Sequence, residues 1–121
     1  MNNVVGYFGS ELNEFIHENC TKEMTAINID LLLHRRSRKK FRIIESKHIN
    51  ERTKNGQRKA LDFLALILKN AQKYFPGWDF GVFIVYGNKP YNSLDILDLI
   101  SRERFRIVGK DNVISWLELN T

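Results

Sequence analysis

Hydrophobic residues along the chain recur with two different spacings, and each spacing predicts one type of element. Two short runs, 26–34 and 40–48, are rich in branched and aromatic residues, as strands are. The basic segment 35–39 separates them, so we expect an antiparallel hairpin. Apolar residues fall on both sides of the two runs, which predicts a central hairpin that is covered on both faces.

The segment from about Asn55 to Tyr74 has helical spacing instead, because its apolar residues recur every three or four positions. The apolar stripe consists of Leu61, Leu64, Leu68, Ala71 and Phe75, and Phe63, Leu66 and Ile67 widen it. Pro76 and Gly77 end the helix. A stripe of this width is expected to pack across the sheet, and it leaves room for contact with a second copy of the chain.

The other segments complete an α/β pattern. Ser10 is a suitable N-cap for a helix that runs through about Asn19. The later segments are a strand at 79–86, a helix or a strand at 94–100, a strand at 104–108 and a closing helix at 111–119 that carries Trp116 into the core. The strand at 79–86 follows a long helix, so it can run parallel to the strand at 40–48 through a right-handed crossover.

Size and composition predict one folded domain that spans 1–121, because the chain has 121 residues and is 43% hydrophobic. No leading apolar segment would serve as a secretory signal, and no apolar run is long enough to cross a membrane. We therefore expect a soluble, cytoplasmic protein. Cys20 is the single cysteine, which is compatible with a reducing compartment, and we expect a buried or incidental thiol.

The net charge of +5 is distributed unevenly along the chain. Residues 35–59 contain eleven of the nineteen basic residues and two acids, which gives +9 in this segment and −4 in the remainder. A dense positive surface suits a phosphate backbone. The alternative is a solvated hairpin tip that has no partner.

Strand register connects this basic segment with candidate chemistry. If the hairpin folds about Ser37 and Arg38, Asp30 lies opposite Glu45 on one face, and Asn28 lies opposite Lys47. Two facing carboxylates are destabilising unless a positive charge lies between them. A divalent cation would supply that charge, and oxygen ligands favour Mg²⁺ or Mn²⁺.

The same residues resemble a known family. Asp30 is followed, after fourteen intervening residues, by Glu45-Ser46-Lys47 in a hydrophobic strand, as in the PD-(D/E)XK nuclease superfamily, and Ile29 stands where the family has proline. The resemblance implies a restriction-endonuclease-like α/β fold, in which a mixed central sheet is flanked by helices with an α-β-β-α-β core. It also implies that Asp30 and Glu45 bind the metal, that Lys47 positions the attacking water, and that the Ser46 carbonyl is an extra ligand.

Two further site residues are expected from this resemblance. An acidic residue on the first helix often completes the metal site in this family, and Glu11 fits that position better than Glu14. The alternative for both is that acids favour the start of a helix. Gln57 resembles the accessory glutamine of several branches of the superfamily, and ordinary surface polarity is its alternative.

Taken together, these residues predict a metal-dependent endonuclease that hydrolyses phosphodiester bonds in DNA, with a Holliday-junction-resolvase-like homodimer as the favoured form. The residues expected to hold the nucleic-acid backbone are Arg35, Arg36, Arg38, Lys39, Lys40, Arg58 and Lys59. The alternatives are a non-catalytic nucleic-acid-binding protein of the same fold and a nuclease toxin domain. Zinc chemistry is not expected, because the three histidines are dispersed and no cysteines are paired.

Overall fold

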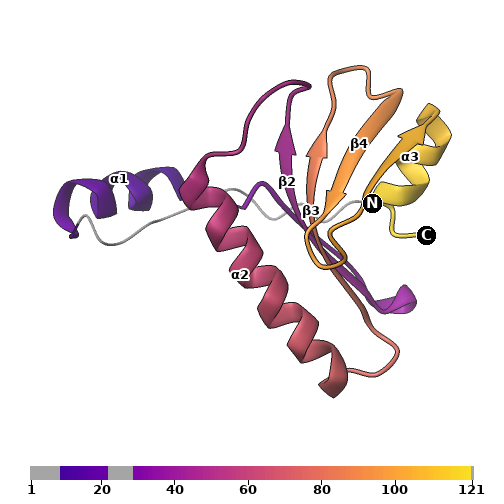
Figure 1. Cartoon of the computed structure of the whole chain (residues 1–121), viewed down its shortest axis with the longest axis horizontal. Coiled ribbons are helices and arrows are strands. Elements are labelled where there is room, and N and C mark those ends of the chain that lie inside the picture. The colour runs from indigo at the N-terminus through magenta and orange to yellow at the C-terminus, as the bar shows by residue number, and fades with distance from the viewer. Residues whose placement is uncertain (1–8, 22–28, 121) are drawn as a thin grey trace.

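The structure, a computed structural model, describes residues 9–21 and 29–120. In chain order its elements are α1 (Gly9–Asn19), β1 (Leu31–Arg35), the 3-10 turn η1 (Arg36–Arg38), β2 (Lys40–Lys47), α2 (Asn55–Ala71), the 3-10 turn η2 (Gln72–Tyr74), β3 (Asp79–Tyr86), β4 (Ser93–Asp98), β5 (Arg104–Val108) and α3 (Lys110–Leu117). Within the described residues the strands form one five-stranded sheet in the order β1-β2-β3-β4-β5 (Figure 1).

Strand pairing confirms the predicted hairpin and the predicted parallel pairing of β2 with β3. β1 and β2 are antiparallel, with Leu31 opposite Ile44 and Arg35 opposite Lys40, which is the predicted register. β2 and β3 are parallel and are joined through α2, whereas the other neighbouring pairs are antiparallel. The chain is therefore an α/β protein with a mixed sheet flanked by helices, and its first elements follow the expected α-β-β-α-β order. The restriction-endonuclease-like character of the fold stays a prediction.

The two faces of the sheet are covered by different helices, because side chains alternate between the faces along each strand. On one face Ile43, Val82, Ile84, Leu97 and Leu99 pack against Leu61 and Ala65 of α2. On the other face Ile44, Phe83, Val85, Leu94 and Ile96 pack against Val113 and Trp116 of α3. Trp116 thus lies in the core, as predicted.

The hairpin is central only in its second strand. β2 lies between β1 and β3, but β1 is the edge strand, and Leu31 and Leu32 are 41% and 55% exposed. The prediction of a hairpin covered on both faces is therefore correct for β2 and wrong for β1. Apolar residues on both sides of a strand indicate contact on both faces, but they do not determine how much of each face a helix reaches.

Several element boundaries differ from the sequence prediction. The first strand begins at Leu31, later than the predicted start at residue 26, and residues 26–28 lie outside the described part of the chain. The segment 94–100 resolves as strand β4. Cys20 is an exposed thiol. Among the described residues, none of the helices is long and apolar enough to cross a membrane.

One basic residue of the segment 35–59 belongs to the core. Arg42 is only 5% exposed, and its guanidinium carbon lies 4.8 Å from the ring centroid of Trp116 and 5.5 Å from that of Phe83. Its Nη1 donates a hydrogen bond to the Trp116 carbonyl at 3.1 Å. Burial lowers the pKa of Arg42 from its ordinary value, and the two aromatic faces offset part of the cost of burying the charge. Arg42 therefore does not contribute to a nucleic-acid surface.

The two sides of α2 provide a test of this packing. Leu61 is 1% exposed and Leu66 is 55% exposed. Leu61→Ala should lower the free energy of unfolding by about 2–5 kcal/mol, because it removes buried atoms and leaves a cavity. At a protein concentration low enough to keep the chain monomeric, Leu66→Ala on the same helix should change it by about 0.5 kcal/mol or less. Urea unfolding followed by circular dichroism measures both, and equal losses would contradict the placement of these residues on opposite sides of α2.

Candidate functional site

The candidate site is built around Glu45, a carboxylate buried in β2 on the α2 side of the sheet. Glu45 is 4% exposed. Its Oε1 accepts a hydrogen bond of 2.6 Å from Gln57 Nε2 and lies 3.5 Å from Lys47 Nζ. Its Oε2 is buried and has no hydrogen-bond partner among the residues that the structure describes. Oε1 of this carboxylate is thus fixed by Gln57 and Lys47, while Oε2 lacks a hydrogen-bond partner among the described residues.

Asp30 lies beside this carboxylate, directly before β1. Because Leu31 pairs with Ile44, the next position along the two strands places Asp30 at Glu45. The Asp30 Oδ2 accepts a hydrogen bond of 2.9 Å from the Ser46 backbone N–H. Burial raises the pKa of Glu45 above its ordinary value, and the negative charge of Asp30 raises it further. The structure therefore brings Asp30 and Glu45 together as the register predicts.

Lys47 is held between two carboxylates. Its Nζ lies 3.5 Å from Glu45 Oε1 and 3.4 Å from Glu51 Oε2, and its side chain is 11% exposed. The hydrogen bond from the His48 backbone N–H lowers the pKa of Glu51, and the charge of Lys47 lowers it as well. Glu51 therefore stays ionised and fixes the ammonium group. Asn28, which was predicted to lie opposite Lys47, is outside the described residues.

Glu51 is a site residue that the sequence motifs did not identify, because it lies in the loop between β2 and α2 and outside the Asp30 and Glu45-Ser46-Lys47 pattern. The loop is anchored to the end of β3 by Asn88, whose Oδ1 accepts a hydrogen bond of 3.3 Å from the Ile49 N–H and lies 3.1 Å from His48 Nδ1. Glu51 lies four residues after Lys47, so a turn between them brings the carboxylate back to the ammonium group. This spacing was the signal in the sequence that could have identified Glu51.

Gln57 joins the site from the first turn of α2. The helix begins at Asn55, and it positions the Gln57 amide to donate to Glu45. The predicted placement of Gln57 beside the acid pair is thus observed in the structure. Arg58 and Lys59 follow in the same turn; Arg58 pairs with Asp62 at 3.4 Å, and Lys59 is exposed.

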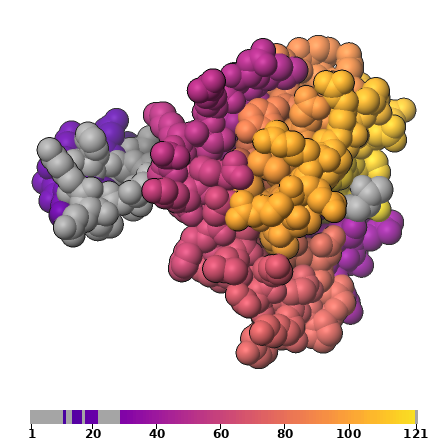
Figure 2. All heavy atoms as spheres, viewed as in Figure 1, coloured from indigo at the N-terminus to yellow at the C-terminus, as the bar shows by residue number. Residues whose placement is uncertain are grey.

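Glu11 is not brought to this site. Figures 1 and 2 show α1, in indigo, to the side of the sheet and beyond the first turn of α2. Glu11 and Glu14 are both exposed, and the described residues contain no cluster of three His, Cys, Asp or Glu side chains that could hold a metal ion. The position of α1 relative to the strands depends on tertiary contacts, which helical periodicity does not specify.

The basic loop lies at the other end of the hairpin from the acid pair (Figure 1). Asp30 precedes β1, and η1 with Arg36 and Arg38 follows it. The five residues of β1 separate these positions by roughly 17 Å at the usual rise of a strand. The expectation that basic charge surrounds the acid pair is therefore wrong for this loop, because a hairpin places its tip and its open end far apart.

Some of the predicted nucleic-acid residues have partners within the chain. Arg35 Nη1 donates to the Glu118 carbonyl at 2.8 Å and also to the Asn120 side chain, and Lys40 Nζ lies 3.9 Å from Asp79. Arg36, Arg38 and Lys39 are exposed in the loop. Among the predicted residues, those that can meet a phosphate backbone are thus mainly these three and, near the start of α2, Lys59.

The donor set fits a hard divalent cation. The unpartnered Glu45 Oε2 and the repulsion between Glu45 and Asp30 are two features that a cation would relieve. Mg²⁺ is usually bound through one or two carboxylates and keeps several waters or substrate phosphates, so two acids are sufficient. The residues that would hold it are Asp30, Glu45 and, through its backbone carbonyl, Ser46.

Comparison with protein-family models, curated proteins and solved structures found no match to this chain. What the chain does must therefore be inferred from the chemistry of its own residues.

The raised pKa of Glu45 predicts how stability depends on pH in chelator-treated protein. A glutamate in an unfolded chain has a pKa of about 4.3, and the pKa of Glu45 in the folded state is higher. The folded state therefore binds this proton more tightly. As pH rises through this interval, the contribution of Glu45 to the free energy of unfolding should fall. The stability of Glu45→Gln minus that of wild type should therefore increase with pH, as measured by urea unfolding from about pH 4 to 8. A difference independent of pH would contradict the assignment.

Metal binding should be visible as stabilisation without any substrate. Saturating Mg²⁺ should raise the melting temperature of wild type, because it binds only the folded state; the gain is about 2.7 kcal/mol at a hundredfold excess over Kd. Asp30→Asn should remove this gain. Asp79→Asn is the matched control, because it removes the same charge from a position paired with Lys40. Equal Mg²⁺ stabilisation of all three proteins would rule out this site.

Proposed function

We propose that this chain is a metal-dependent endonuclease that hydrolyses phosphodiester bonds in DNA. The observation that carries the proposal is the buried Glu45, which faces Asp30, has one unpartnered oxygen and lies beside a fixed lysine. An ionisable group that is destabilised by burial and by a second acid is typical of functional sites. A structural role alone would be served better by an apolar side chain at this position.

Each residue has a distinct task in this reaction. A cation held by Asp30, Glu45 and the Ser46 carbonyl would supply stabilisation of charge on the phosphate and a lower pKa for water. The Gln57 amide holds Glu45 Oε1 and so directs Oε2 toward ligand binding. Glu51 holds the Lys47 ammonium at the edge of the site.

Lys47 orients the attacking water. An ammonium group donates up to three hydrogen bonds and accepts none, so it can fix a water oxygen and stabilise negative charge as that charge develops. The water oxygen forms a bond to phosphorus and the water gives one proton to the solvent, while the bond from phosphorus to the leaving sugar oxygen breaks and the leaving oxygen takes a proton from the solvent. Lys47 is 11% exposed and already oriented by two carboxylates, so it requires little rearrangement for this task.

The path of the DNA follows the hairpin. The exposed loop residues Arg36, Arg38 and Lys39 lie at one end of β1, and the acid pair lies at the other. Measured along the axis of a duplex, roughly 17 Å corresponds to about five phosphates of one strand. The loop therefore holds the backbone at a distance from the cut, and this contact should weaken as salt rises.

A homodimer is the assembly that we propose for this enzyme. Phe63, Leu66 and Ile67 form a stripe along the outer side of α2, and they are 64%, 55% and 48% exposed. An apolar stripe of this kind is a common site of protein contact. A two-fold dimer through α2 would provide two cutting sites, as a resolvase-like enzyme requires.

Cleavage assays test the function directly. Labelled linear duplex, single strands, flaps and four-way junctions would be incubated with Mg²⁺, Mn²⁺ or chelator. Wild type should cut only with metal, and Asp30→Asn and Lys47→Ala should each lower the rate by about a hundredfold or more, because each removes a charge that acts on the transition state. Asp79→Asn should cut at the wild-type rate.

One outcome favours the alternative function. If wild type binds these DNAs in a salt-sensitive manner but does not cut any of them with either metal, the chain is a non-catalytic nucleic-acid-binding protein.

A further inference from the structure

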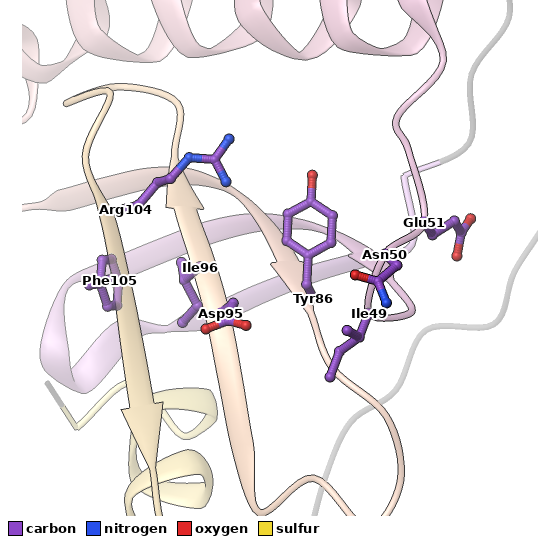
Figure 3. A pocket seen from close by; sticks show the side chains of 8 residues that line it. All are labelled: Ile49, Asn50, Glu51, Tyr86, Asp95, Ile96, Arg104 and Phe105. Carbon is purple, nitrogen blue, oxygen red and sulfur yellow. The ribbon is translucent and has the colours of Figure 1, made fainter.

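A cleft of about 480 Å³ lies beside the candidate site, on the surface of the sheet formed by β3, β4 and β5 (Figure 3). Its walls come from residues 49–51 after β2, from Tyr86 at the end of β3, and from Arg104 on β5. Pockets that hold small organic ligands range from roughly 300 to 1,000 Å³. The cleft is therefore large enough for one nucleotide unit and too small for a folded partner.

The cleft and the candidate site are continuous. Glu51 lines the cleft, and its Oε2 lies 3.4 Å from Lys47 Nζ. Tyr86 is paired with Lys47 in the parallel register of β2 and β3, so their backbones are about 4.8 Å apart. A group bound in the cleft would thus lie next to the water that Lys47 is proposed to orient.

The charges that remain open in the cleft favour an anion. Asp95 is paired with Arg106, with 2.8 Å between Oδ1 and Nε, and Glu51 is paired with Lys47. Arg104 is exposed and forms no ion pair with any residue that the structure describes. Each acid of the cleft therefore has a basic partner, which Glu51 shares with Glu45, whereas the Arg104 guanidinium is left for a ligand.

The remaining walls suit a flat, partly polar ring. Figure 3 shows the Tyr86 ring rising from the sheet between the Arg104 guanidinium on one side and the Asn50 amide on the other. A tyrosine face can stack with any nucleobase, and an amide can both donate to and accept from the edge of a base. A cation, an aromatic face and an amide around one cleft are the three kinds of contact that a nucleotide uses.

We propose that this cleft binds one unpaired nucleotide next to the scissile phosphate, with its base against Tyr86 and its phosphate on Arg104. The inference rests on the proposed nuclease function for its position next to a cut. A base that is stacked and paired in a duplex cannot enter the cleft without leaving the helix. The preferred substrates are therefore nucleic acids with an unpaired nucleotide at the cut, such as flaps, junctions or single strands.

Binding can be tested without metal and without cleavage. Deoxyadenosine monophosphate, deoxyribose phosphate and inorganic phosphate would each be titrated into the full chain with chelator present, and amide chemical shifts would be followed by NMR. The nucleotide should shift the amides around Tyr86, Asp95 and Arg104, and it should bind at least about tenfold more tightly than the sugar phosphate, which has no base to stack.

Variants separate the two contacts. Tyr86→Leu keeps an apolar side chain but removes the aromatic face, and Arg104→Gln removes the charge, so each should weaken nucleotide binding by about tenfold. Tyr86→Phe and Lys110→Gln are the matched controls, and both should bind like wild type. Equal affinity for the nucleotide and the sugar phosphate, or no shifts around the cleft at the highest soluble nucleotide concentration, would overturn the proposal.

Failure of this inference is distinguishable from failure of the nuclease function. A chain that binds the nucleotide here but never cuts keeps the nucleotide site and loses the catalytic function. A chain that cuts flaps and paired duplex equally well, with no effect of Tyr86→Leu on the ratio of the two rates, keeps the nuclease function and overturns the cleft as its substrate site.

Discussion

The antiparallel register of β1 against β2 determines where each charged group of the site lies. Pairing of Leu31 with Ile44 places Asp30 at Glu45, and alternation along β2 then puts Lys47 on the same face. Since α2 covers this face, its first turn can bring Gln57 to the same carboxylate. A shift of one residue between the strands would turn Asp30 toward α3 and separate all of these groups.

Burial of Glu45 makes this arrangement costly in the absence of a ligand. A buried polar atom without a partner costs about 1–3 kcal/mol, and more when it is charged, whereas a whole domain is stable by only about 5–15 kcal/mol. Gln57 and Lys47 satisfy one oxygen and leave the other open. The fold therefore retains a destabilising group where several elements converge, as is expected of a site shaped by ligand binding.

Features that depend on local sequence patterns could be predicted from the sequence. Strand alternation and hairpin length predicted the pairing of β1 with β2 and the facing of Asp30 and Glu45. The family resemblance implied that Lys47 and Gln57 join them. Several features that depend on long-range packing were not predicted. Among the described residues, Glu11 on α1 joins no metal-binding cluster with the acids, and α3 draws Arg42 into the core. The cleft combines residues of the loop after β2 with residues of β3, β4 and β5, which no short motif connects.

The bond between Arg35 and the end of the chain has a practical consequence. Arg35 Nη1 donates to the Glu118 carbonyl and to the Asn120 side chain, so the final described residues lie against the base of the loop 36–39. An affinity tag or dye attached at this end would emerge beside the exposed positive charges of this loop. An acidic tag would compete with nucleic acid for those charges. A small neutral fluorophore at the same position would instead report the binding of nucleic acid.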